Sequence, residues 1–388
     1  MLIDSTLREG AQAYGVYFGE GAKRRMAELL AAVGVDEMEC GWLGQPGLED
    51  FLAWANGALP ALAPGGEAPA LGVWCPCREA DAAAAAKLAQ AGLVSRVHIG
   101  APSSALHREK RLGLGRGEML TRVAAVVSAA QAGGAKYISV GLEDVSRADP
   151  DEALELARAA VAAGAARVRL SDTVGLLTPL ATARLVRRFV AELPVPVALH
   201  AHNDLGMAAA NAVTALECGA AFVDVSALGL GERAGIAPLE QVAAWAVQQN
   251  CSLGPRYDLS HLRALCLLAA QVAKTPVSRH RPVVGEDIFA AESGIHVHGL
   301  LRDPTLFEPF DPQTVGATRR VAVGAQSGAA AIEAAARRLG VEPAADRPGG
   351  EDGAQAEPSP ARARLDRVRA QASRLGRPLT DKELLAVL

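Results

Sequence analysis

The chain has 388 residues, of which 50% are hydrophobic and 21% are charged, so it can bury a large core and is not an intrinsically disordered polymer. Its 39 basic and 43 acidic residues give a net charge of −4 without a long block of one sign, which excludes the electrostatic footprint of nucleic-acid binding. No stretch reaches the roughly 20 apolar residues of a membrane helix, and the first residues do not resemble a signal peptide. We therefore expect a cytoplasmic protein that binds neither nucleic acid nor membrane.

From residue 2 to about 250 one pattern occurs eight times: a short apolar or β-branched run, a loop with glycine or polar residues, and an Ala/Leu-rich segment with helical spacing. The predicted strands are 2–6, 37–42, 70–75, 95–100, 137–142, 167–172, 197–202 and 222–227. The predicted helices lie near 20–33, 47–57, 78–91, 116–132, 150–163, 178–192, 206–218 and 238–249. Eight regular strand–helix units predict an α/β fold, a closed (β/α)8 TIM barrel, rather than an open sheet.

The rest of the chain predicts a small, mostly helical C-terminal region. We expect the barrel over residues 1–255 and a post-barrel helical subdomain over 256–340, with one helix at 258–274 and another at 328–339. Residues 341–360 are rich in Pro, Gly, Ala and acids, and predict a flexible linker. Residues 361–388 return to helical spacing and predict a helical tail, docked on this subunit or on a neighbouring one.

The six cysteines are scattered through apolar segments, and only Cys75 and Cys77 are close together. A zinc site of the paired CxxC kind would need a second pair. We therefore expect buried, reduced thiols.

Reactive groups of a parallel barrel lie at the carboxyl ends of its strands. His200 and His202 fall there, on one face of their strand and about 6.6 Å apart along it, with Ala201 turned the other way. The loop after the first strand carries acidic, basic and amide side chains, and the first and seventh strands lie near each other around a closed ring. Two imidazoles and one carboxylate suit a divalent metal ion with open positions for a chelating substrate. Hydrogen-bonded histidines that merely fill the barrel are the alternative.

Three further features have two interpretations each. Arg169 shares a strand face with Thr173 and lies deeper, where it could receive a substrate carboxylate or pair with a barrel acid. Residues 229–235 (GLGERAG) suit either a phosphate-binding loop or a tight turn. Residues 292–299 (ESGIHVHG) place two histidines beyond the barrel, where they reach a barrel mouth only by folding back or by crossing to a partner subunit, which indicates a dimer.

With these residues in view, the chain resembles the homocitrate synthase and isopropylmalate synthase family of acyl-CoA Claisen-condensing enzymes. The matching motifs run in family order and are residues 4–10 (DSTLREG), 171–175 (SDTVG), 200–206 (HAHNDLG), 229–235 (GLGERAG) and 292–296 (ESGIH). The resemblance is closest to the short homocitrate synthases associated with nitrogenase cofactor assembly. Glu9, where isopropylmalate synthases usually have Asp, and Ile236, where they have Asn, point the same way.

The resemblance implies a homodimeric homocitrate synthase that condenses acetyl-CoA with 2-oxoglutarate and hydrolyses the thioester. It implies that Glu9, His200 and His202 hold a divalent ion (Mg, Mn or Zn). The implied catalytic residues are Arg8, which stabilises charge on the substrate oxygen, Glu143 and His296, which serve proton removal, with His296 supplied by the partner chain. The implied substrate-binding residues are Gln12, His98, Ser139, Arg169 and Thr173.

The sequence departs from the family pattern at several positions. Phe307 stands where a Tyr is frequent, and His298 stands where an Asp is usual. Ser139 replaces the Arg with which lysine-pathway homocitrate synthases hold the distal carboxylate, so Arg169 is a candidate to take that role. Three alternatives follow: an isopropylmalate or citramalate synthase, a divergent metal-binding homologue that has lost condensation, or an acyl-CoA lyase on the same barrel.

Overall fold

The computed structural model describes residues 1–249, 256–342 and 359–388, and it divides the chain into two compact units, Met1–Val277 and Ser278–Leu388. The boundary expected at residue 255 lies outside the described residues. So does most of the expected linker, residues 343–358. The helix expected at 258–274 belongs to the first unit: it is α10 (Leu262–Ala273), and it packs on α1 (Glu20–Val33).

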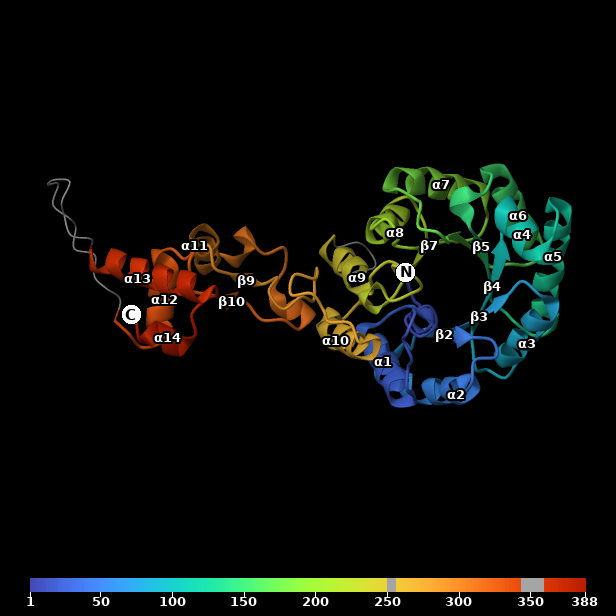
Figure 1. The fold of residues 1–388 in the computed structure, drawn as a ribbon. Helices are drawn as coiled ribbons and strands as arrows, with labels where there is room; N and C mark the ends of the chain where they lie inside the picture. Colours follow the sequence, from blue (N-terminus) through green and yellow to red (C-terminus); the bar gives the residue numbers. More distant parts are fainter. Residues whose placement is uncertain (250–255, 343–358) are drawn as a thin grey trace. The chain divides into compact units, whose positions relative to one another are not determined.

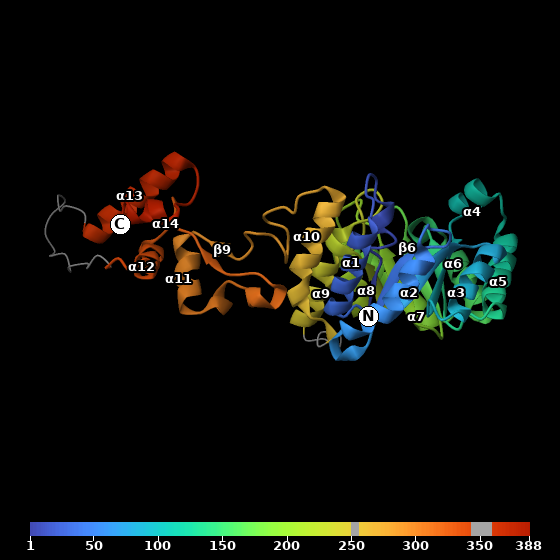
Figure 2. The ribbon, with the colours of Figure 1, turned by 90° about the horizontal axis from the view of Figure 1, so that it is seen from below.

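The first unit is a closed barrel of parallel strands in the order β1 to β8, which confirms the predicted fold (Figure 1). Its strands are Leu2–Asp4, Glu37–Trp42, Ala70–Pro76, Arg96–Pro102, Ile138–Glu143, Arg167–Asp172, Val197–Ala201 and Phe222–Val225. Its helices α1 to α10 are Glu20–Val33, Leu48–Ala58, Glu79–Gln90, Ala105–Leu112, Arg116–Ala132, Pro150–Ala162, Pro179–Glu192, Ala208–Glu217, Leu239–Gln248 and Leu262–Ala273. Figure 2 shows these helices running along the outside of the barrel.

Helix boundaries follow local chemistry. Asp149 caps the start of α6 through its side chain, and Pro150 occupies the first helical position, where its missing N–H costs nothing. Gly34 ends α1 in the left-handed conformation that glycine adopts without a steric penalty. Helix α4 was not expected: Ser104 caps it, but the segment is short and strongly charged, and its one buried residue is Arg108.

The barrel interior is built partly from ion pairs. Arg167 on β6 is fully buried and donates from Nη1 and Nη2 to the two carboxylate oxygens of Glu37 on β2, at 2.8 Å each. One layer closer to the carboxyl ends, Arg169 donates to Glu39 at 2.8 Å. Because alternate residues of a strand face the same side, Arg167 and Arg169 both point inward, and each meets an acid from the same partner strand.

The second unit is small and mainly helical, as expected. It contains α11 (Gly294–Arg302), α12 (Ala329–Arg338), α13 (Pro360–Leu375), α14 (Asp381–Leu385) and a two-stranded sheet of β9 (Ala290–Ala291) and β10 (Arg320–Val321). Its core joins Val297, Ile332, Val368 and Leu384. The C-terminal helices α13 and α14 therefore pack on α12 within the same subunit.

The cysteines that the structure describes are all free thiols, and each is buried except the half-buried Cys218. Burial raises the pKa of Cys75 and of Cys77 to about 12, so neither is a ready nucleophile. Cys251 lies outside the described residues. Among the helices of residues 1–249, 256–342 and 359–388, none has the length and apolar character that crossing a bilayer requires.

Candidate metal centre and active site

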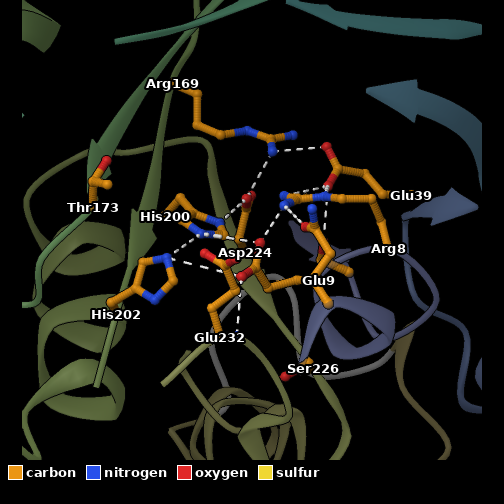
Figure 3. Close-up of polar contacts among 12 residues, drawn as sticks. Arg8, Glu9, Glu39, Arg169, Thr173, His200, His202, Asp224, Ser226 and Glu232 are labelled. Carbon is orange, nitrogen blue, oxygen red and sulfur yellow. Dashed lines mark hydrogen bonds and ion pairs between the residues drawn. The ribbon is translucent and has the colours of Figure 1, made fainter. Parts of the chain in front are cut away.

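Glu9, His200 and His202 converge at the carboxyl-terminal mouth of the barrel (Figure 3). One potential ligand atom from each lies within 4.8 Å of the others, and all three residues are buried. The two Nε2 atoms are 3.3 Å apart, and Glu9 places its oxygens 3.9 Å from His200 Nε2 and 4.0 Å from His202 Nε2. The strand order explains the convergence, since β8 alone separates β1 from β7 around the ring.

The electrostatics favour ligand-ready protonation states. Burial would raise the pKa of Glu9, but the charge of Arg8 and the neighbouring histidines outweigh it and lower the pKa to about 2. Burial and His200 lower the pKa of His202 to about 3. An ionised carboxylate and a neutral imidazole are the forms that bind a metal ion.

A chain of buried charges adjoins these three residues (Figure 3). Arg8 pairs with Glu9 and donates from Nε to Glu39 at 2.9 Å. Arg169 Nη1 lies 2.8 Å from Glu39 and 2.8 Å from Asp224, whose Oδ2 lies 2.6 Å from His200 Nδ1. Arg169 therefore pairs with barrel acids, yet its Nε and Nη2 have no partner among the described residues, which leaves buried donors for a ligand.

A cavity of about 220 Å³ opens over this chain of charges. Its lining includes nine of the ten site residues predicted within the barrel: Arg8, Glu9, Gln12, His98, Glu143, Arg169, Thr173, His200 and His202. Ser139 is not in the lining. It is fully buried below His98, so it can act on the cavity only through that ring.

The contacts of Ser139 define how His98 faces the cavity. Ser139 Oγ accepts from Arg167 Nε at 3.0 Å, so its own hydrogen is available to His98 Nδ1, also at 3.0 Å. His98 then carries its hydrogen on Nε2, directed at Gly141, where a Cβ would come within 2.7 Å of that nitrogen. Burial and the charge of Arg169 hold the pKa of His98 well below its usual range, so the ring is a neutral donor.

Glu143, Gln12 and Thr173 occupy the rim of the cavity. Glu143, at the end of β5, accepts from Arg111 of α4 at 2.8 Å. Gln12 is exposed and accepts from Arg8 Nη1 at 3.2 Å, and Thr173 Oγ1 accepts from the backbone N–H of Asp144 at 2.8 Å.

His296 belongs to the second unit, Ser278–Leu388. It is exposed on α11, its Nδ1 lies 2.9 Å from Ser293 Oγ, and its ring meets the edge of Phe307 with centroids 4.6 Å apart. Gly299 allows this contact, since a Cβ there would come within 2.2 Å of the Phe307 ring.

Residues 229–235 form a tight turn that contacts Glu9 and Asp204. Gly235 has φ +80° and its Cβ would lie 1.8 Å from the Gly229 carbonyl oxygen, so no other residue fits. The backbone N–H of Glu232 donates to Glu9 at 3.3 Å, and Arg233 pairs with Asp204 at 2.9 Å. The contacts of this loop are thus those of the tight-turn interpretation.

Sequence reasoning missed Glu39 and Asp224, which connect the two arginines and His200. Each is a buried acid at an inward-facing position of a largely apolar strand, and that is the signal that could have found them. It also missed Trp74 and Arg111 in the cavity lining, for which no motif gave a cue, and it gave no site role to Glu232, which lies within the motif 229–235.

The donor set fits a divalent cation. One carboxylate and two imidazoles converge from separate loops, and the close approach of the two Nε2 atoms is satisfied by one shared cation. The surrounding network contains three carboxyl groups, those of Glu9, Glu39 and Asp224, and two guanidinium groups, those of Arg8 and Arg169. Acidic groups therefore outnumber basic groups by one, and a bound cation would balance the excess.

The fold and site define a parallel (β/α)8 barrel with a carboxylate and two imidazoles at its mouth. Comparison with known proteins identifies the family to which this barrel belongs. The sequence model of the HMGL-like family matches residues 1–268, and that of the "homocitrate synthase post-HMGL domain-like" family matches residues 283–347. The chain belongs to the HMGL-like family, in the branch of the homocitrate and isopropylmalate synthases whose motifs it carries.

Two relatives and one solved structure illustrate the similarity. A homocitrate synthase of Frankia alni is 40% identical over 87% of this chain and 93% of its own length. A 2-isopropylmalate synthase of Caldanaerobacter subterraneus is 35% identical over 99% of this chain and 94% of its own length. The crystal structure of an HMG-CoA lyase of Bacillus subtilis has a TM-score of 0.59 at 22% identity, covering 73% of this chain and 97% of that one, and supports the fold alone.

Proposed function

We propose that the protein is a homocitrate synthase, which condenses acetyl-CoA with 2-oxoglutarate and hydrolyses the thioester to release homocitrate and CoA. The observation that carries the proposal is the convergence of Glu9, His200 and His202 beside the buried guanidinium groups of Arg8 and Arg169. The similarity to the Frankia alni homocitrate synthase supports it.

Glu9, His200 and His202 would hold the divalent ion. When bound, the ion supplies Lewis-acid polarisation of the 2-oxo carbonyl group. Arg8 places its guanidinium group next to Glu9 and stabilises negative charge on the carbonyl oxygen. Gln12 and Thr173, on the rim, orient the oxo acid and exclude water from its carbonyl face.

Arg169 and His98 bind the second carboxylate of 2-oxoglutarate in this proposal. The unpartnered Nε and Nη2 of Arg169 and the Nε2–H of His98 are buried donors on the cavity wall, and a carboxylate satisfies such donors in pairs. Ser139 contributes by fixing the His98 tautomer.

Glu143 and His296 are assigned to proton transfer. Glu143 lies on the cavity lining, where it removes a proton from the acetyl methyl group. His296 Nδ1 contacts Ser293 Oγ, and its Nε2 has no hydrogen-bond partner among the described residues, which suits a proton-transferring group. We propose that a homodimer brings His296 of one chain to the barrel mouth of the other.

A substrate panel tests the proposed function. Purified protein loaded with Mn²⁺ or Zn²⁺ is mixed with acetyl-CoA and, in turn, 2-oxoglutarate, pyruvate and 2-oxoisovalerate, while free thiol and product mass are recorded. We expect CoA release and homocitrate with 2-oxoglutarate. Turnover only with pyruvate or 2-oxoisovalerate would instead assign citramalate or isopropylmalate synthesis. No turnover with any oxo acid, followed by turnover of a Phe307→Tyr variant, would assign lost condensation.

The role of Arg169 is tested by Arg169→Lys, which keeps the charge and the pairs with Glu39 and Asp224 but removes the planar fork. We expect the ratio of kcat/KM for 2-oxoglutarate over 2-oxobutyrate to fall about 10- to 100-fold, the size of one lost charged hydrogen bond. Arg96→Lys, at a half-buried arginine of β4 outside the cavity lining, is the control. An unchanged ratio in Arg169→Lys would remove Arg169 from substrate selection.

A further inference from the structure

Asp224 lies outside the proposed ligand set, yet its carboxyl group contacts both a proposed metal ligand, His200, and a residue of the cavity wall, Arg169. It is fully buried on β8, and its Oδ2 lies 2.6 Å from His200 Nδ1 and 2.8 Å from Arg169 Nη1. The strand register places it between the two halves of the site: Asp224 lies opposite Ile3 of β1, and its neighbour Val223 lies opposite Leu199 of β7.

The proton between Asp224 and His200 belongs to the histidine. Arg169 has only donors, so Oδ2 of Asp224 must accept from it at 2.8 Å, and that oxygen acts as an acceptor. The same oxygen then accepts from His200, whose hydrogen is on Nδ1. In a neutral imidazole this leaves the Nε2 lone pair free, and Nε2 is the atom that faces His202 and Glu9.

We infer that Asp224 is a positioning residue that fixes the tautomer and ring orientation of His200, so that His200 Nε2 is presented to a divalent cation. The inference rests on the proposed role of Glu9, His200 and His202 as ligands, and it adds a residue that neither the motifs nor the comparisons assign. When the nitrogen that does not bind the metal donates its N–H to a carboxylate, the ligating nitrogen of the same histidine also becomes more basic.

His202 provides an internal contrast. Its Nδ1 is buried without a hydrogen-bond partner among the described residues, so no side chain there fixes its tautomer. The two imidazoles therefore differ: Asp224 holds the His200 ring in advance, whereas His202 directly follows β7 and is positioned by its isolated backbone bridge with Ile236. Because Asp224 also holds Arg169, one carboxylate aligns the cation site and the cavity wall together.

Metal affinity is the first test. Asp224→Asn and Asp224→Ala are titrated with Mn²⁺ and Zn²⁺ by calorimetry in the absence of substrates. We expect affinity to fall about 10- to 100-fold, with the larger loss in Asp224→Ala. Asp4→Asn is the matched control: Asp4 is equally buried on the adjacent strand β1, but among the described residues its carboxyl group accepts only from Thr6. We expect its metal affinity to equal that of the wild type, and unaltered affinity in both Asp224 variants would overturn the inference.

The tautomer itself is the second test, and it does not depend on metal or activity. In the metal-free protein with ¹⁵N-labelled histidine, the ring signals of His200 are identified by their loss in His200→Ala. We expect the Nδ1–H tautomer in the wild type and in Asp4→Asn, and loss of that preference in Asp224→Ala. A wild-type His200 that carries its hydrogen on Nε2 would overturn the inference. Absence of condensation with an intact Nδ1–H signature would count against the proposed function alone.

Discussion

His200→Ala is expected to abolish both stoichiometric binding of a divalent cation and turnover, while the barrel stays folded. The substitution removes one of three ligand atoms that lie within 4.8 Å of one another, and Glu9 and His202 cannot form a closed protein ligand set alone. The free energy of unfolding should fall by about 1–3 kcal/mol, because Asp224 loses one buried hydrogen-bond donor. The barrel should stay folded, since Asp224 keeps its ion pair with Arg169.

The measurement combines metal content after dialysis, calorimetric titration with Mn²⁺ or Zn²⁺, and thermal unfolding of the metal-free protein. His261→Ala is the matched control, since His261 belongs to the same unit but its side chain is 42% exposed and faces Asp258, away from the barrel interior. We expect that control to bind metal and turn over normally. A His200→Ala protein that retained one tightly bound cation and ordinary rates would show that the ligand assignment is wrong.

The barrel could be predicted because its elements repeat a pattern with a physical origin. The strand 167–172 and the helix 116–132 were predicted with the bounds that the structure has, since each combines an apolar run or helical period with a clear stop. Helix α4 was missed because Lys110, Arg111 and their neighbours give it no apolar face, and its start depends on a Ser104 cap that also bonds Asp144 across the fold.

Only part of the candidate site could be predicted, because some of its contacts join residues close in sequence and others join distant strands. His200 lies in β7 and His202 directly follows it, so their relation follows from the period of two of the predicted strand 197–202. Glu39 and Asp224 lie 185 residues apart and meet only through Arg169, and such contacts depend on the strand register around the closed ring. The sequence left Arg169 with two interpretations, and the contacts show acid pairing together with unpartnered buried donors.

Arg8→Ala is expected to lower kcat about 10²- to 10³-fold, the effect of removing one donor to a developing oxyanion. Burial would lower the pKa of the Arg8 guanidinium group, but the carboxylates of Glu39 and Glu9 outweigh it and raise the pKa, so the group remains charged throughout the pH range of any assay. Its contacts with Glu9, Glu39 and Gln12 hold it in the cavity lining before substrate arrives. A charge fixed in advance stabilises the transition state without reorganisation, so kcat rather than KM should change most.

The same substitution leaves Glu39 with Arg169 as its remaining cationic partner, so a loss of stability could imitate a loss of catalysis. Arg8→Lys separates the two effects, because it keeps a positive charge near both acids but cannot donate from two directions at once. We expect Arg8→Lys to unfold at the wild-type temperature and still lose turnover, and both variants to bind Mn²⁺, since Arg8 is not a ligand. If kcat in Arg8→Ala stayed at the wild-type value while only KM rose, Arg8 would bind the oxo acid without stabilising charge on its oxygen.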